Sequence, residues 1–137
     1  YLPDLKPDLF AKTISHAKAI ASPHSAILLF PLDGALNRLA EDHSSVGNRD
    51  AAWVINIAAS WDKAEDDQTH IKWARAAWQD MRGFSTGGTY VNFLTDEEGD
   101  DRVHAAYRNN YQRLVEVKSK WDPENLFLTN KNIAPRV

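Results

Sequence analysis

Tyr90 and Asn92 place a phenol and a carboxamide two residues apart, and both groups can act on a polar substrate. A phenol can hydrogen-bond a substrate hydroxyl or accept its proton. A carboxamide offers a donor and an acceptor, so it can orient a substrate or the edge of a ring. Taken alone, the two residues are explained better as an aromatic side chain packing across a strand and an amide held in a turn. Their chemistry by itself therefore assigns no function.

The histidines invite a metal-site hypothesis, which their spacing does not support. None of the five lies three or four residues from another, the spacing of helical zinc ligands. Asp66 and Asp67 precede His70 at helical spacing, and we interpret this group as an exposed charged face. The sequence also lacks a Gly-x-Ser-x-Gly nucleophile elbow and both common glycine-rich phosphate loops. The histidines are His16, His24, His43, His70 and His104, and we predict no metal site among them.

The composition is that of an ordinary globular domain and excludes several classes of function. The chain has 137 residues, of which 43% are hydrophobic and 26% charged. A net charge of −3 without clustered Lys and Arg argues against a nucleic-acid partner. No apolar run reaches the roughly 18 residues that span a bilayer, and the N-terminus lacks the pattern of a signal peptide. We therefore expect a soluble chain, and we favour the cytoplasm over secretion.

The elements that position these side chains follow from apolar periodicity. Helical spacing predicts helices at about residues 7–21, 64–82 and 101–120, and apolar runs predict strands at 25–32, 51–60 and 89–94. Pro7 suits the first turn of the first helix, and Pro123 stops the last one. The expected fold is α+β, with a mostly antiparallel sheet of three or more strands and helices mainly on one face.

The apolar positions also predict which face of each helix is buried. In the first helix the expected stripe is Phe10, Ile14, Ala17 and Ala21. In the second it is Ile71, Ala74, Trp78 and Met81, and in the third it is Val103, Tyr107, Leu114, Val117 and Trp121. In the strand at 51–60, Trp53, Ile55 and Ile57 share one face, because side chains alternate along a strand.

Four motifs in the last third of the chain carry a family resemblance. Tyr-Val-Asn at 90–92, Asn-Tyr-x-Arg-Leu-x-x-x-Lys at 110–118 and Trp-Asp-Pro-x-Asn-x-Phe at 121–127 occur in that order. Asn-Lys-Asn-Ile follows at 130–133, with Lys131 where Gln is usual. This order resembles the C-terminal segment of berberine bridge enzyme-like FAD-linked oxidases, which belong to the vanillyl-alcohol-oxidase superfamily.

Weaker likenesses extend the resemblance upstream. Gly-Ala-Leu-Asn-Arg at 34–38 is similar to Gly-Ala-Val-x-Arg, and residues 46–51 are similar to Phe-x-His-Arg-x-Ala, with Asn48 in place of His. Ser-Trp at 60–61 and Trp-Ala-Arg at 73–75 also match positions common in bacterial members. The likeness covers nearly the whole chain and is dense only after Gly88.

The resemblance implies a C-terminal fragment or subunit of an FAD-dependent oxidoreductase. Such an enzyme takes hydride from a C–H bond of an alcohol or amine and passes electrons to oxygen. Tyr90 would be the base or its hydrogen-bond partner, Asn92 would position substrate or flavin, and Asn125 would join both in contacting the cofactor. Many relatives place a polar or acidic side chain on the strand at 51–60. We expect the apolar Ile55 and Ile57 on that face here, so the strand supplies no carboxylate. Tyr90 is therefore the candidate base.

The resemblance also implies how the chain is divided and what it meets. Residues 1–87 would be part of a substrate-binding domain and residues 88–137 the berberine bridge enzyme-like segment. An FAD-binding domain, absent from this chain, would hold most of the FAD. Expected partners are a small-molecule substrate, that domain and a second copy through an open sheet edge, while Phe127 would anchor the tail in the core. The rival hypothesis is a non-catalytic, stand-alone α+β module that binds a ligand or partner.

Overall fold

The computed structural model describes residues 1–95, 98–128 and 131–136, and the chain forms two compact units that interleave in sequence. Unit 1 combines Tyr1–Asp33 with Ala51–Thr86, and unit 2 combines Gly34–Asp50 with Gly87–Val137. Helices and a small antiparallel sheet together confirm the α+β class. No helix in the described ranges is long and apolar enough to cross a membrane.

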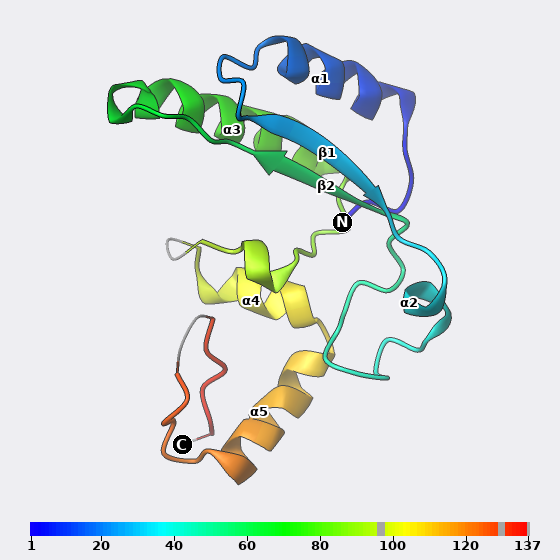
Figure 1. Cartoon of the computed structure of the whole chain (residues 1–137). Helices are drawn as coiled ribbons and strands as arrows, with labels where there is room; N and C mark the ends of the chain where they lie inside the picture. The colour runs from blue at the N-terminus through cyan, green and yellow to red at the C-terminus, as the bar shows by residue number, and fades with distance from the viewer. Residues whose placement is uncertain (96–97, 129–130, 137) are drawn as a thin grey trace. The chain divides into compact units, whose positions relative to one another are not determined.

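Unit 1 is a two-stranded antiparallel sheet covered by two helices. Strand β1 (Ala26–Pro31) pairs with β2 (Trp53–Ala58), so that Ala26 lies opposite Ala58 and Pro31 opposite Trp53. Helix α1 (Pro7–Lys18) contacts β1, and α3 (Asp67–Met81) contacts β2 (Figure 1). Short 3-10 helices η1 (Ala64–Asp66) and η2 (Arg82–Phe84) flank α3. The expected positions of both strands and of α1 and α3 are therefore confirmed to within three residues at each end.

The core of unit 1 lies between the helices and one face of the sheet. Leu2, Leu9 and Met81 are buried at its centre, because apolar side chains from both layers lose contact with water there. The partly buried residues around them are Leu5, Ile27, Leu29, Trp53, Ile55, Ile57 and Phe84. Trp53, Ile55 and Ile57 share one face as predicted. That face is the core face, so the expectation that Ile55 and Ile57 face a substrate is not supported by their packing.

The buried face of α1 is shifted from the predicted stripe by one residue. Leu9 is 1% exposed, whereas Phe10 is 41% exposed and Ile14 also faces solvent. The reason is the way α1 meets α3: the His16 ring lies 2.8 Å from Asp80, and the Trp73 indole donates to the His16 carbonyl oxygen at 3.0 Å. Polar contacts therefore hold the side of α1 that carries Leu9 against α3.

In α3 the predicted stripe is partly correct. Met81 is buried as expected, but the other buried positions are His70 and Ala77, while Trp78 is exposed. The interpretation of His70 as part of an exposed charged face is wrong. Its ring stacks on Trp61 with 5.0 Å between ring centroids, and an aromatic face shields one side of the imidazole from water.

Unit 2 contains α2 (Ala35–Arg38), the 3-10 helix η3 (Val91–Phe93), α4 (Asp100–Tyr107) and α5 (Asn110–Trp121). The single helix predicted at 101–120 is thus two helices. Arg108 separates them with φ +50°, a left-handed conformation that a continuous helix does not accept. Val103 is buried as predicted, together with Ala106 and Val115, but Val117 and Trp121 are exposed.

The third strand, predicted at 89–94, is wrong. Residues 91–93 form η3 instead, and within the described part of the chain the sheet consists of β1 and β2, with Leu2 adding an isolated bridge to Trp53. Backbone hydrogen bonds from Phe93 to the Tyr90 carbonyl and from Leu94 to the Val91 carbonyl close the turn. Local bonds of this kind compete with strand pairing, and here no neighbouring strand supplies an alternative.

Candidate functional site

Tyr90 and Asn92 lie together at the turn η3. The Asn92 side-chain nitrogen donates a hydrogen bond to the Tyr90 hydroxyl at 2.7 Å. The Phe93 ring meets Tyr90 edge to face, with 5.0 Å between centroids and 87° between planes. Tyr90 is 44% exposed, and both Asn92 and Phe93 reach solvent. The turn therefore presents a phenol, a carboxamide and an aromatic ring on an open surface.

The turn geometry explains why these three side chains meet. An extended strand would have placed Phe93 on the face opposite Tyr90 and Asn92. In the 3-10 turn the chain tightens to about three residues per turn, so Phe93 comes back over Tyr90. The alternation of residues 89–94 is typical of a strand, in which Phe93 would face away from Tyr90, so the pattern does not indicate Phe93 as a member of the site.

Asn125 lies in a different turn, directly after α5. Its backbone has φ +54°, and its N–H donates to the Asp122 carbonyl oxygen at 3.0 Å. Among the described residues its side-chain oxygen is buried without a hydrogen-bond partner. An unpaired buried acceptor is unfavourable, so this oxygen has a free capacity to accept a bond. The structure thus brings Tyr90 and Asn92 together and places Asn125 in a separate turn.

The turn that carries Asn125 is organised by the carboxylate of Asp122. Its oxygens accept hydrogen bonds from the N–H groups of Leu126 at 2.7 Å and Phe127 at 3.0 Å, and from the Lys118 ammonium. These hydrogen bonds hold the pKa of the Asp122 carboxyl below its ordinary value. The bond from Lys118 has the largest effect, and the two backbone N–H groups have smaller ones. Lys118 also donates to the Phe127 carbonyl oxygen at 2.6 Å.

Phe127 itself does not anchor the tail in the core, and that expectation is wrong. Its side chain is 80% exposed, and Trp121, Leu126 and Leu128 are exposed as well. The backbone of Phe127 is held by Asp122 and Lys118, so the turn is fixed through polar main-chain contacts, not through apolar burial.

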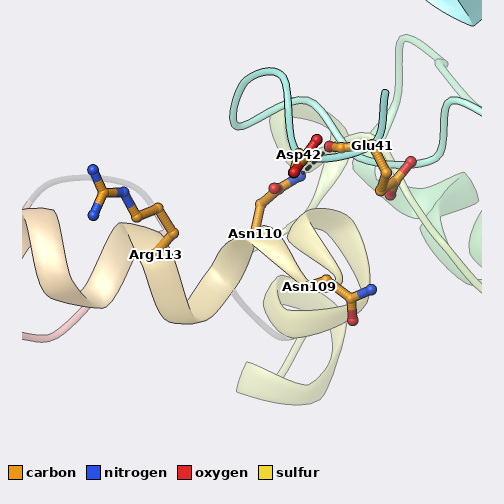
Figure 2. Close-up of a pocket in the computed structure, with 5 residues that line it drawn as sticks. All are labelled: Glu41, Asp42, Asn109, Asn110 and Arg113. Atoms are coloured by element: carbon orange, nitrogen blue, oxygen red, sulfur yellow. Dashed lines mark hydrogen bonds between the residues drawn. The ribbon is translucent and has the colours of Figure 1, made fainter. Parts of the chain in front are cut away.

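A second group of polar residues lies in unit 2 around the carboxylate of Glu41. Its two oxygens accept the backbone N–H groups of Asn48 at 3.0 Å and Arg49 at 3.2 Å, and Arg108 approaches to 3.7 Å. The Asn110 side chain donates to the Glu41 carbonyl oxygen at 2.8 Å, as Figure 2 shows. The sequence did not single out Glu41, because nothing in its spacing predicts a contact with Asn110, 69 positions away.

An open pocket of about 540 Å³ lies beside this group. Its lining residues are Glu41, Asp42, Asn109, Asn110 and Arg113 (Figure 2). Asn110 points to the Glu41 segment, whereas the Arg113 side chain extends away along α5. Tyr90, Asn92 and Asn125 do not line this pocket. It is polar and open, and most ligand sites are more apolar and more enclosed.

In the part of the chain that is described, no three His, Asp or Glu side chains gather where they could hold one metal ion. The side chains at η3 have the chemistry to contact a flat polar ring. Tyr90 and Asn92 offer hydrogen bonds to a ring edge, and Phe93 offers an apolar surface beside them. This set suits an isoalloxazine ring, while the sequence holds no glycine-rich loop for the phosphates of a dinucleotide.

The family described as "Berberine and berberine like" matches residues 89–134. The chain is similar to tetrahydroberberine oxidase of Berberis wilsoniae, with 27% identity over 125 residues, covering 80% of this chain and 24% of the relative. It is also similar to aclacinomycin-N/aclacinomycin-A oxidase of Streptomyces galilaeus, with 23% identity over 137 residues. This match covers 88% of this chain and 25% of the relative. FAD-linked oxidoreductase YgaK of Bacillus subtilis is 30% identical over 104 residues. This match covers 76% of this chain and 23% of the relative. The chain thus spans about a quarter of the length of these relatives.

Solved structures share the fold. Glycopeptide hexose oxidase superimposes with a TM-score of 0.83 at 21% identity, covering 98% of this chain and 31% of that chain. Wild-type BBE-like 1 of Physcomitrella patens superimposes with a TM-score of 0.80 at 20% identity, covering 98% of this chain and 29% of that chain. At these identities the likeness concerns the fold alone, and it confirms the α+β class.

Proposed function

We propose that the chain, whose residues 89–134 match the family described as "Berberine and berberine like", forms the C-terminal part of an FAD-linked oxidase acting on a small molecule. The substrate class we propose is an alcohol or amine that loses hydride from the carbon next to its polar group, with oxygen as the final acceptor. The proposed partners are the substrate and an FAD-binding domain of the same protein.

One observation carries this proposal: the exposed pair of Tyr90 and Asn92, joined by a 2.7 Å hydrogen bond. FAD, when bound, accepts the hydride and passes the electrons to oxygen. Loss of hydride from an alcohol carbon gives a neutral carbonyl only if the hydroxyl also gives up its proton, whereas a neutral amine loses hydride to form an iminium ion and needs no proton acceptor in that step. The Tyr90 oxygen is the group proposed to hold or accept the hydroxyl proton.

Asn92 has a distinct role in this proposal. Its amide already donates to the Tyr90 oxygen, so it fixes the direction in which the phenol can make its next hydrogen bond. The same donor would stabilise the negative charge that this oxygen has to carry before it accepts the substrate proton. Phe93 limits the positions of the Tyr90 ring from the side. Asn125 is proposed to contact the cofactor through its buried oxygen, which has no partner in the described residues.

The test is expression of the complete reading frame that contains this chain. We expect a yellow protein with flavin absorption in the visible, bleached anaerobically by an alcohol or amine from a substrate panel and restored by oxygen. The 137-residue chain, prepared in parallel as the control, should not retain flavin through gel filtration. A complete protein that folds but carries no flavin after addition of FAD would contradict the proposal and favour the non-catalytic binding module.

A further inference from the structure

Asn48 is buried next to the segment that leads to Tyr90. It is 1% exposed and has φ +63°, a left-handed conformation that asparagine accepts more readily than most residues. Its N–H donates to Glu41 at 3.0 Å, and the following N–H of Arg49 donates to the same carboxylate. Two charge-assisted bonds therefore fix the backbone on which the Asn48 side chain is mounted.

The Asn48 side chain lies against Gly88. Its nitrogen donates to the carbonyl oxygen of Ala106 on α4 at 3.2 Å, which sets the orientation of the amide. A Cβ atom built on Gly88 would lie 1.7 Å from the Asn48 side-chain oxygen and 2.4 Å from its Cγ. Only a glycine α-carbon can lie this close, because any larger residue would overlap the amide. The backbone at Gly88 thus rests directly on the Asn48 carboxamide.

Gly88 is two residues before Tyr90, where the turn η3 begins. We infer that Asn48 is a positioning residue for the Tyr90–Asn92 pair, acting through its contact with Gly88. Glu41 accepts the backbone N–H of Asn48, the Ala106 carbonyl accepts its side-chain N–H, and the side-chain amide held in this way lies against the α-carbon of Gly88. The effect on catalysis rests on the proposed function, whereas the effect on the geometry of the turn does not.

The geometric part is tested by nuclear magnetic resonance on the ¹⁵N-labelled 137-residue chain. The variant is Asn48→Gly, which removes the amide and tolerates positive φ without strain. We expect the side-chain amide signals of Asn92, which report its bond to Tyr90, to shift or broaden. The backbone N–H signals of Leu126 and Phe127, which are bonded to the Asp122 carboxylate in the same unit, serve as an internal measure of folding.

The matched control is Asn37→Ala. It removes an amide that donates to the Arg49 carbonyl oxygen at 2.9 Å in the same segment, and Gly88 is not part of that contact. The Asn92 signals should stay in place in this control. If Asn48→Gly does not fold, Asn48→Asp keeps the size and the tolerance for positive φ while it replaces the donor facing Ala106 by an oxygen. Unchanged Asn92 signals in a folded Asn48→Gly or Asn48→Asp chain would overturn the inference.

The catalytic part is tested in the complete flavoprotein by the rate of flavin reduction at saturating substrate. A misplacement of about 1 Å can slow a reaction by roughly 10²-fold, so Asn48→Gly should lose at least about tenfold, and Asn37→Ala should not. In a Tyr90→Phe background the loss from Asn48→Gly should disappear, because both changes act on one group. An equal loss in both backgrounds would overturn the positioning role. If Tyr90→Phe alone has no effect, the proposed function fails while the resonance test of the geometry still stands.

Discussion

Lys118 and Asp122 lie one helical turn apart, and the ammonium of the first donates a hydrogen bond to the carboxylate of the second. The pair closes the C-terminal end of α5, where the last carbonyl groups of a helix lack partners within it. Lys118 extends the contact to the Phe127 carbonyl, and Asp122 extends it to two backbone N–H groups. One ion pair therefore fixes both the end of the helix and the turn that carries Asn125.

The pH dependence of stability should reveal this pair. The pKa of Asp122 is lowered in the folded chain, chiefly by Lys118, so the ionised carboxylate stabilises the fold. That stabilisation is fully present above the unfolded pKa of about 3.9 and is lost as pH falls through the lower, folded pKa. Asp122→Asn should therefore unfold at lower denaturant concentration than wild type near pH 7, and the difference should shrink below about pH 4.

The measurement is urea unfolding between pH 2 and 7, chosen to span roughly the carboxylate range. Glu124→Gln is the matched control, because it removes one negative charge from an exposed position in the same turn. A constant difference between Asp122→Asn and wild type over the whole range would contradict the role given to the carboxylate.

Replacement of the phenol hydroxyl should slow catalysis selectively. In the complete flavoprotein, Tyr90→Phe should lower the rate of flavin reduction by roughly 10²-fold if the hydroxyl acts as a general base. Tyr111→Phe is the control, because the Tyr111 ring stacks on His104 at 3.6 Å and this contact does not need its hydroxyl. Stopped-flow reduction under anaerobic conditions measures both. An unchanged rate in Tyr90→Phe would remove this residue from the chemistry.

A methyl group at Gly88 should destabilise the fold. Gly88→Ala forces a Cβ into the space of the Asn48 amide, which is buried and bonded to Ala106, so it should lose about 1–3 kcal/mol of unfolding free energy. Gly83→Ala meets no atom within 4 Å and should change stability by less than about 1 kcal/mol. Chemical denaturation of the two variants makes the comparison. Equal stabilities would mean that Asn48 moves aside without strain.

The buried face of α1 can be tested with two neighbouring residues. Leu9→Ala should cost about 2–5 kcal/mol, because it opens a cavity beside Leu2 and Met81. Phe10→Ala should cost clearly less, about 1 kcal/mol, since Phe10 is 41% exposed and is not part of the buried cluster. Thermal or urea unfolding distinguishes the two. A larger loss of unfolding free energy in Phe10→Ala than in Leu9→Ala would mean that the face predicted from periodicity is the buried one.

Much of the fold could be predicted from the sequence where local signals are strong. The two strands and the helices α1 and α3 are bounded by proline or by changes of period, and those boundaries fall near the observed ones. The break at Arg108 could not be predicted, because the apolar spacing of residues 101–120 continues across it and no glycine or proline marks it. The one-residue shift of the α1 face arises from contacts with Asp80 and Trp73, which lie far away in sequence.

The candidate site was predictable only through the family motif. That motif identifies Tyr90 and Asn92, but the alternation of the stretch predicts a strand and so gives no sign of their mutual hydrogen bond. The motifs include Asn48 and adjoin Gly88 without indicating that the two touch, and no motif includes Glu41, because the importance of these residues lies in contacts between segments. Asn48 and Ala106, for instance, are 58 residues apart, and no local pattern reports a contact over such a separation.

The interleaving of the two units has a consequence for anyone who wishes to shorten the chain. Residues Gly34–Asp50 belong with the segment that starts at Gly87, so neither unit is a continuous stretch of sequence. A cut near Gly88 would separate Glu41 from Asn110 and Arg108, leaving a buried polar segment without the partners it needs. Domain excision would therefore require a circular rearrangement or a linker in place of Ala51–Thr86. During folding, unit 2 has to close a loop that contains half of unit 1, a long-range step that slows folding.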